Sequence, residues 1–372
     1  MQWHQNPAER RQHSSAKWCT YSDNELPLWV ADMDCVSPPC VNEILKAAIQ
    51  HGIFGYGLES PGFRDAWVTH LKLRHQWEIN PDWICPVAGV VPGMRMALMA
   101  HPECRDILIP SPCYPYFQTV PKIEGRTHFP VNLWPQNGAL YPETEAIKKA
   151  LLSTKNRPAI LWCNPQNPGG TVYCESFIKN LCAEAENANA LIISDEIWAD
   201  LILSEKSHVP IGKMAPENQP TITLMAATKT FNVAGFGCAV AIIPEANTRK
   251  RFKETLIAMP HVMPIAYKIT EACLKEGQDW YQGLIEALRA NKNQITEWAK
   301  SHPELSIITG DASFLAWIKS RNADAYLNTR FCNAGVRLSG GTPFGDPEAV
   351  RLNFGCSPDT LTEALNRMNS AL

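Results

Sequence analysis

Lys229 stands in the segment MAATKTFNVAG, residues 225–235, among small and apolar neighbours and with no acidic residue in that segment. Lys229 is expected at the end of an apolar strand, TLMAATK, where a lysine can lose its hydration, which lowers its pKa and favours Schiff-base chemistry with carbonyl compounds. A lysine whose stem covers apolar surface while its ammonium group reaches water would have the same local sequence. The segment therefore leaves two interpretations open, one catalytic and one structural.

Two more charged residues interrupt apolar runs. Asp195 follows the apolar start of LIISDEIW, so we expect it at the inner end of a buried strand, where a carboxylate needs a cationic or strongly donating partner. Its alternative role is to cap the next helix. Arg351 lies in the strand-like run AVRLNFG, and it either pairs with a buried acid or binds a ligand carboxylate through two parallel hydrogen bonds.

Three uncharged motifs complete the set. In VAGVVPGMRMALMA a turn leads into an amphipathic helix, whose free N–H groups at Val90 and Val91 can bind a phosphate, although most helix starts bind nothing. The turn CNPQNPGG carries Asn164 and Asn167 and is either a tight turn alone or part of a site. The segment SPCYPYF adds aromatic rings. In order along one chain, these motifs supply what pyridoxal phosphate requires: an anion site, a stacking ring, an acid and a lysine.

The elements that must position these residues alternate between two patterns. Short apolar runs in RDILIPSP, PAILWCNP, ALIISDEI, TITLMAA and CAVAIIP predict buried strands, and amphipathic stretches such as CESFIKNLCAEAENA predict helices between them. Before them, CVNEILKAAIQHG predicts a helix with Gly52 just past its end. This alternation predicts an α/β fold with a mainly parallel sheet, whose ligands bind beyond the carboxyl ends of the strands. After Pro260, a long helical stretch and three strand-like runs predict a smaller α+β domain. We expect an irregular N-terminal segment 1–40 packing on the small domain, a large domain 41–260 and a small domain 261–372.

Composition limits the partners of the protein. The 372 residues carry a formal charge of −3, which gives no basic field for nucleic acid or an acidic membrane surface. No apolar run is long enough to span a bilayer, and the N-terminus has no signal-peptide core. The thirteen cysteines are scattered singly, without the paired spacing of a zinc site. We therefore expect a cytoplasmic enzyme with reduced cysteines and no metal ligands.

The motifs SAKWCTY, PLWVADMD, FGYG, SPCYPYF, CNPQNPGG, SDEIW, TKTFNVAG and FGDPEAVRLNFGCSP cover nearly the whole chain. Together they resemble fold-type I pyridoxal-phosphate enzymes of the aminotransferase class I/II superfamily, and within it the MalY/PatB group of cystathionine β-lyases, or C–S lyases. The resemblance implies a large domain with a mainly parallel, seven-stranded type of sheet and a smaller α+β domain. It also implies α,β-elimination from cystathionine or another cysteine S-conjugate, giving a thiol, pyruvate and ammonia. An aminotransferase, or a protein with a mainly regulatory or binding role, is the alternative.

The resemblance also implies roles for the residues that handle the substrate. Lys229 would bind the cofactor covalently and later move the substrate Cα proton. Asp195 would keep the pyridine nitrogen protonated. Arg351 would bind the substrate α-carboxylate, aided by Asn167 and by the backbone near Ala31.

Other residues would hold the cofactor. Tyr114 would stack on its ring, and Asn167 would bond its 3-oxygen. Val90 and Val91 would bind the phosphate through backbone N–H groups, together with Thr228. Tyr56 would reach that phosphate from a neighbouring subunit, since enzymes of this kind are homodimers with shared active sites.

Three positions depart from the pattern of these enzymes. Ala226 stands where relatives often carry a phosphate-binding serine, and Gly237 stands where many aminotransferases carry a phosphate-binding arginine. Trp198 takes the place of a His or Tyr near the cofactor 3-oxygen, and an indole can donate one hydrogen bond but cannot accept one. We expect weaker phosphate retention than in these relatives. The missing arginine also fits the C–S lyases better than the aminotransferases.

Overall fold

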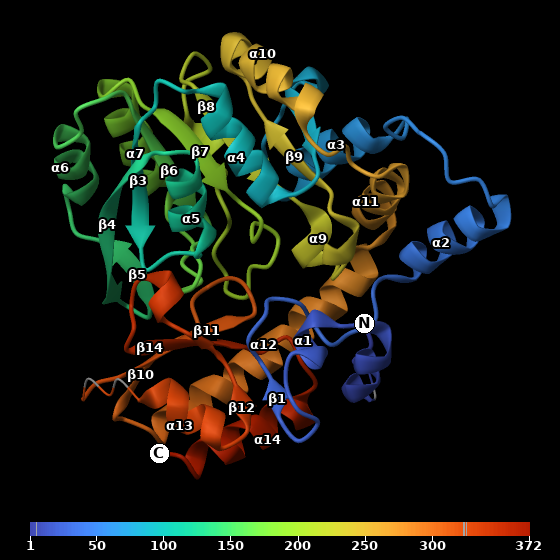
Figure 1. The fold of residues 1–372 in the computed structure, drawn as a ribbon, viewed down its shortest axis with the longest axis vertical. Coiled ribbons are helices and arrows are strands. Elements are labelled where there is room, and N and C mark those ends of the chain that lie inside the picture. Colours follow the sequence, from blue (N-terminus) through green and yellow to red (C-terminus); the bar gives the residue numbers. More distant parts are fainter. Residues whose placement is uncertain (5, 323, 325) are drawn as a thin grey trace.

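A computed structural model describes residues 1–4, 6–322, 324 and 326–372 and contains a larger and a smaller sheet (Figure 1). The larger sheet has the strand order β2-β9-β8-β7-β6-β3-β4-β5. Neighbours from β4 through β3, β6 and β7 to β8 are parallel, whereas β9 and the edge strands β2 and β5 pair antiparallel. The strands are β2 (Ile84–Val87), β3 (Asp106–Ser111), β4 (Thr127–Gln136), β5 (Ala139–Pro142), β6 (Pro158–Cys163), β7 (Leu191–Asp195), β8 (Thr221–Met225) and β9 (Ala239–Ile242).

The five apolar runs expected to be strands all form strands of this sheet, namely β3, β6, β7, β8 and β9. Every residue of β6, β7 and β8 is buried, as expected for central strands covered on both faces. Successive residues of a strand point to opposite faces, so Ile193 packs in the core that includes α4, whereas Ile192 packs with α7. The sheet gains an edge strand, β5, beyond the expected seven-stranded type.

Helices and short 3₁₀ turns connect the strands of the larger sheet. They are α2 (Pro39–His51), α3 (Phe63–His75), η2 (Pro81–Trp83), α4 (Val90–Ala100), α5 (Tyr116–Ile123), α6 (Ala146–Leu152), α7 (Glu175–Asn187), α8 (Ile211–Met214), α9 (Ala227–Thr230), η3 (Ala234–Phe236), α10 (Ala246–Thr255) and η4 (Leu256–Ala258). Helix α2 ends at Gly52, whose positive φ of 70° lets its N–H bond the Ala48 carbonyl, as its sequence predicts.

The smaller sheet has the antiparallel order β10-β11-β14-β13, below the larger sheet in Figure 1. The chain from Pro264 onward forms α11 (Pro264–Glu276), α12 (Gln278–Lys300), β10 (Leu305–Ile308), β11 (Leu315–Ser320), α13 (Leu327–Asn333), β12 (Val336–Arg337), β13 (Ser339–Gly340), η5 (Thr342–Phe344), β14 (Ala349–Asn353) and α14 (Pro358–Asn369), of which β12 lies outside the smaller sheet. The long helical stretch is thus two helices that meet at Gly277. No helix in the described part of the chain has the length and apolar composition to cross a membrane.

The N-terminal segment lies against the C-terminal part of the chain. Its elements are η1 (Pro7–His13), α1 (Ala16–Cys19) and β1 (Leu26–Pro27), so it is less irregular than its sequence indicates. Strand β1 pairs in parallel with β12. The three-part domain division remains a prediction, although this pairing agrees with an N-terminal segment that packs on the small domain. All thirteen cysteines lie in the described residues and are free.

Candidate active site

One cavity of about 300 Å³ is bordered by the N-terminal segment, the larger sheet and strand β14. All but one of the cofactor-binding and substrate-binding residues predicted from the sequence line this cavity, although Ala31 and Arg351 are separated by most of the chain. The predicted residues that line it come from both ends and the middle of the chain. They are Ala31, Val90, Val91, Tyr114, Asn167, Asp195, Trp198, Thr228, Lys229 and Arg351. Tyr56 does not line it, because Tyr56 is fully exposed on the loop between α2 and α3.

Lys229 lies in the one-turn helix α9, not at the strand end where its sequence placed it. Strand β8 stops at Met225, and α9 begins two residues later, which directs the side chain into the cavity. The Nζ atom donates a hydrogen bond to the Ala31 carbonyl. Burial lowers the pKa of Lys229 to about 8, and the carboxylate of Asp32 partly opposes this effect. The amine is thus brought close to the neutral form that a nucleophile or base needs.

Asp195 is the last residue of β7 and is only 3% exposed. Its Oδ1 atom accepts a hydrogen bond of 3.2 Å from the Ile197 backbone N–H, and no lysine, arginine or histidine of the described residues forms an ion pair with it. Burial raises the pKa of Asp195 to about 7. A buried carboxylate with a single hydrogen bond and no ion pair among the described residues is suited to bind a cationic or N–H group of a ligand.

Arg351 lies in the middle of β14 and is also buried without an acidic partner among the described residues. Its guanidinium donates to Asn167 Oδ1 at 3.2 Å and to the Trp29 carbonyl at 3.0 Å. The Nε atom has no partner, and burial lowers the pKa of Arg351 to about 10. Burial of a cation without an acidic partner costs free energy, and a ligand carboxylate bound by the Arg351 guanidinium would offset that cost.

The start of α4 forms the candidate anion-binding corner. Gly89 is the N-cap residue, and the helix begins at Val90, so the N–H groups of Val90 and Val91 have no partner within the helix. Gly237 lines the same corner with a φ of 46°, and a Cβ there would lie 3.0 Å from the Ala88 carbonyl oxygen. This backbone therefore disfavours an arginine at position 237.

Two aromatic residues border the cavity. Burial raises the pKa of Tyr114 to about 12, so its hydroxyl stays protonated at neutral pH. Trp198 is 2% exposed and meets the Phe314 ring edge-on, with centroids 5.0 Å apart. The indole is therefore fixed in the wall of the cavity.

Sequence reasoning missed the two asparagines that hold the N-terminal segment over the cavity. The Asn232 amide bonds the Met33 N–H and carbonyl, both at 3.0 Å, and the Cys35 carbonyl at 2.8 Å. Asn353 donates to the carbonyls of Val30 and Asp32. The motifs TKTFN and RLNFGC thus hold WVADMD, which puts the Ala31 carbonyl on Lys229. Both asparagines lie in motifs that the sequence analysis had singled out, but those motifs do not reveal that the asparagines bind the backbone of WVADMD.

A charged cluster anchors the same segment. Lys17, fully buried, pairs with Asp34 at 2.7 Å, and Arg10 pairs with Asp32 at 2.7 Å. The two acids belong to WVADMD, so the cluster holds that motif through its side chains, whereas the two asparagines bind its backbone. Of these acids, Asp32 acts electrostatically on Lys229.

Comparison with known proteins agrees with this arrangement. The aminotransferase class I and II family model matches residues 32–368. Cystathionine β-lyase PatB of Bacillus subtilis (strain 168) is 31% identical, with 98% of each chain covered. The crystal structure of OvoB is similar at a TM-score of 0.93 and 34% identity, covering 98% of this chain and 97% of OvoB.

Cystalysin from Treponema denticola, whose crystal structure contains pyridoxal 5′-phosphate, has a TM-score of 0.91 and 28% identity, covering 97% of this chain and 96% of cystalysin. The expected fold class and the resemblance to the PatB group are both confirmed. The chain therefore belongs to the aminotransferase class I and II family.

Proposed function

We propose that this protein is a pyridoxal-phosphate-dependent C–S β-lyase that cleaves L-cystathionine or a related cysteine S-conjugate. Its relative PatB is a cystathionine β-lyase by name, and cystalysin contains pyridoxal phosphate. The observation that carries the proposal is the pair Asp195 and Lys229. These residues line one cavity with their pKa values at about 7 and 8, and neither has an ion-pair partner among the described residues.

The cavity fits the cofactor at each of its polar ends. The N–H groups of Val90 and Val91, with Thr228, would hold the phosphate. The unpaired carboxylate of Asp195 would bind the ring N–H. Tyr114 and Asn167 line the same cavity and would contact the ring and its 3-oxygen.

When bound, the cofactor withdraws electrons from the substrate Cα and so makes the Cα–H bond acidic. Asp195 would hold the proton on the ring nitrogen, because its carboxylate forms no ion pair with any described residue. Arg351 binds the substrate α-carboxylate through two N–H donors and so fixes the orientation of Cα. Lys229 Nζ takes the Cα proton. The Cβ–S bond then breaks with release of a thiol, and hydrolysis of the remaining fragment gives pyruvate and ammonia.

The decisive experiment incubates the purified protein with L-cystathionine and pyridoxal phosphate and measures pyruvate and free thiol. We expect both products in equal amounts without a keto-acid acceptor, and none from Lys229→Ala. Product that forms only with an added keto acid would instead support the aminotransferase alternative. Bound cofactor without turnover of any thioether would favour a regulatory role.

We further propose a homodimer in which Tyr56 contributes to the partner's site. The loop after α2 exposes an apolar run that an isolated chain would leave in water: Ile53 (71% exposed), Phe54 (77%), Tyr56 and Leu58 (91%). The test mixes Lys229→Ala with Tyr56→Phe under conditions that allow subunit exchange. Recovery of activity above the sum of the two variants supports shared sites, and purely additive activity contradicts them.

A further inference from the structure

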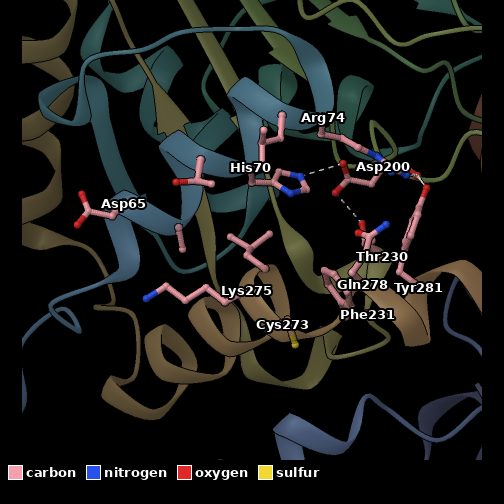
Figure 2. Close-up of a pocket in the computed structure, with 14 residues that line it drawn as sticks. Asp65, His70, Arg74, Asp200, Thr230, Phe231, Cys273, Lys275, Gln278 and Tyr281 are labelled. Atoms are coloured by element: carbon pink, nitrogen blue, oxygen red, sulfur yellow. Dashed lines mark hydrogen bonds and ion pairs between the residues drawn. The ribbon is translucent and has the colours of Figure 1, made fainter.

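A second cavity, of about 540 Å³, lies between α3, α9, α11 and the start of α12 (Figure 2). None of the residues assigned to the proposed lyase site lines it. His70, Asp200 and Thr230 meet at one side of this cavity, next to Tyr281. Thr230 follows Lys229 directly, so the two cavities flank the same short helix.

Two imidazoles converge there on one carboxylate oxygen. The Nε2 atoms of His70 and His75 each lie 3.0 Å from Asp200 Oδ1, and all three atoms lie within 4.8 Å of one another. His75 and Asp200 are buried, and His70 is half-buried at the cavity wall. The two histidines come from the last two turns of α3, and Asp200 comes from the segment beyond β7.

The carboxylate of Asp200 has no permanent cationic partner among the described residues. Its only ion pairs are with the two imidazoles, and its Oδ2 accepts a hydrogen bond of 3.2 Å from Thr230. The nearby Arg74 binds the Asp200 backbone carbonyl and stacks on Tyr281.

We propose that His70, His75 and Asp200 form a binding site for one divalent transition-metal ion of the zinc class. In tetrahedral coordination at Zn–N and Zn–O distances near 2.1 Å, neighbouring ligand atoms are about 3.4 Å apart. The two observed separations of 3.0 Å are close to that spacing, so small side-chain shifts suffice. Two imidazoles favour zinc, nickel or copper over calcium or magnesium.

His70 and Asp200 line the cavity, so water or a small ligand could reach the bound ion from that side and take the fourth coordination position. His208 lies edge-on to His75, with ring centroids 5.2 Å apart, but its Nε2 is bound to Glu196 Oε2 at 2.7 Å. Three protein ligands with an open position leave room for water or a small ligand. This site also differs from the expectation of no metal ligands, which rested only on cysteine spacing.

The test titrates the cofactor-loaded protein with Co²⁺ and records its visible spectrum, followed by competition with Zn²⁺. We expect one tightly bound ion per chain, with the bands of a four-coordinate nitrogen and oxygen site and without a thiolate-to-cobalt charge-transfer band. His70→Gln should weaken binding at least tenfold. His128→Gln is the matched control, because His128 is exposed on β4 and outside the cluster, and it should bind as the natural protein does.

Three outcomes would overturn the proposal. They are no Co²⁺ uptake by the natural protein, a charge-transfer band that identifies a cysteine ligand, and unchanged affinity in His70→Gln. The spectrum of the natural protein decides even if a variant fails to fold. Zn²⁺ should also raise the Tm of the natural protein and of His128→Gln but not that of His70→Gln.

Discussion

Asp195 and Asp200 belong to the same segment and are equally buried, yet their environments hold them in opposite states. Burial raises the pKa of Asp195 to about 7, because one hydrogen bond from a backbone N–H and the more distant charge of Lys229 do not offset it, and no described residue forms an ion pair with this carboxylate. Burial acts in the same direction on Asp200, but the charge and hydrogen bonds of His70 and His75 hold its pKa well below the ordinary value. Burial therefore does not fix the charge of a carboxylate; its partners do. Among the described residues, Asp195 forms no ion pair, whereas the Asp200 carboxylate contacts two imidazoles.

The sharpest test of this comparison replaces each acid by asparagine. Asp195→Asn should lower kcat for cystathionine cleavage at least about 10³-fold, because an amide cannot keep the ring nitrogen protonated. It should leave the cofactor-free protein as stable as before or more stable. Asp200→Asn should instead lower the free energy of unfolding by about 2–4 kcal/mol, since it disrupts a buried hydrogen-bonded cluster. Steady-state kinetics measures kcat, and urea unfolding measures the free energy of unfolding. Equal losses of kcat and equal losses of stability in the two variants would contradict the comparison.

The pH dependence of stability gives a second test, on the cofactor-free protein. A carboxyl whose folded pKa is about 7 and whose unfolded pKa is about 4 binds more protons in the native state between these values. Its contribution to stability is thus present below pH 4 and is lost as the pH rises to 7. Asp195→Asn should remove this loss, worth up to about 4 kcal/mol at 1.36 kcal/mol per pKa unit. Urea unfolding of the natural protein and of Asp195→Asn from pH 4 to 8 measures it, and parallel dependences of stability on pH in the two proteins would contradict the assignment.

The same contrast exists between cations. Lys17 is buried against Asp34, whereas Arg351 is buried with no acid among the described residues. Arg351→Lys should raise KM for cystathionine about 10²-fold with little loss of Tm, because the bidentate grip on a carboxylate is lost. Lys17→Met should lower Tm strongly, because it removes one of the two cations, Lys17 and Arg10, that pair with the buried Asp34 carboxylate. A large Tm loss in Arg351→Lys without a KM change would identify Arg351 as structural.

The smallest expected effect is on cofactor affinity at the candidate anion-binding corner. Ala226→Ser should lower the Kd for pyridoxal phosphate about threefold to tenfold, by adding one hydrogen bond to a charged group. Gly237→Arg should not do so, since the φ of 46° and the nearby Ala88 carbonyl strain any side chain there. Dialysis followed by absorbance of the retained cofactor compares these variants. Stoichiometric cofactor in the natural protein after long dialysis would contradict weak retention.

Local patterns predicted much of the fold. The five buried strands were identified because apolar runs bounded by Pro, Gly and Asn leave few alternatives. The turn into α4 and the end of α2 at Gly52 were predicted for the same local reasons. Lys229 was predicted at the end of a strand but lies in the helix that follows it, α9. This helix has only four residues, which is too short for a helical periodicity of apolar residues to be recognised in the sequence. The edge strand β5 was missed, since hairpin pairing with β4 and not its own composition defines it.

The sequence alone determined which residues carry the proposed chemistry, because Lys229, Asp195, Asn167 and Arg351 lie in contiguous motifs of recognisable type. Tertiary structure decided what each one faces. It placed Asn232 and Asn353 on the segment around Ala31, and it left Asp195 and Arg351 unpaired in one cavity. It also gathered His70 and His75 on an acid 125 or more residues away. Such partnerships depend on chain crossings that no local periodicity encodes, and they set the charge, and hence the function, of each buried group.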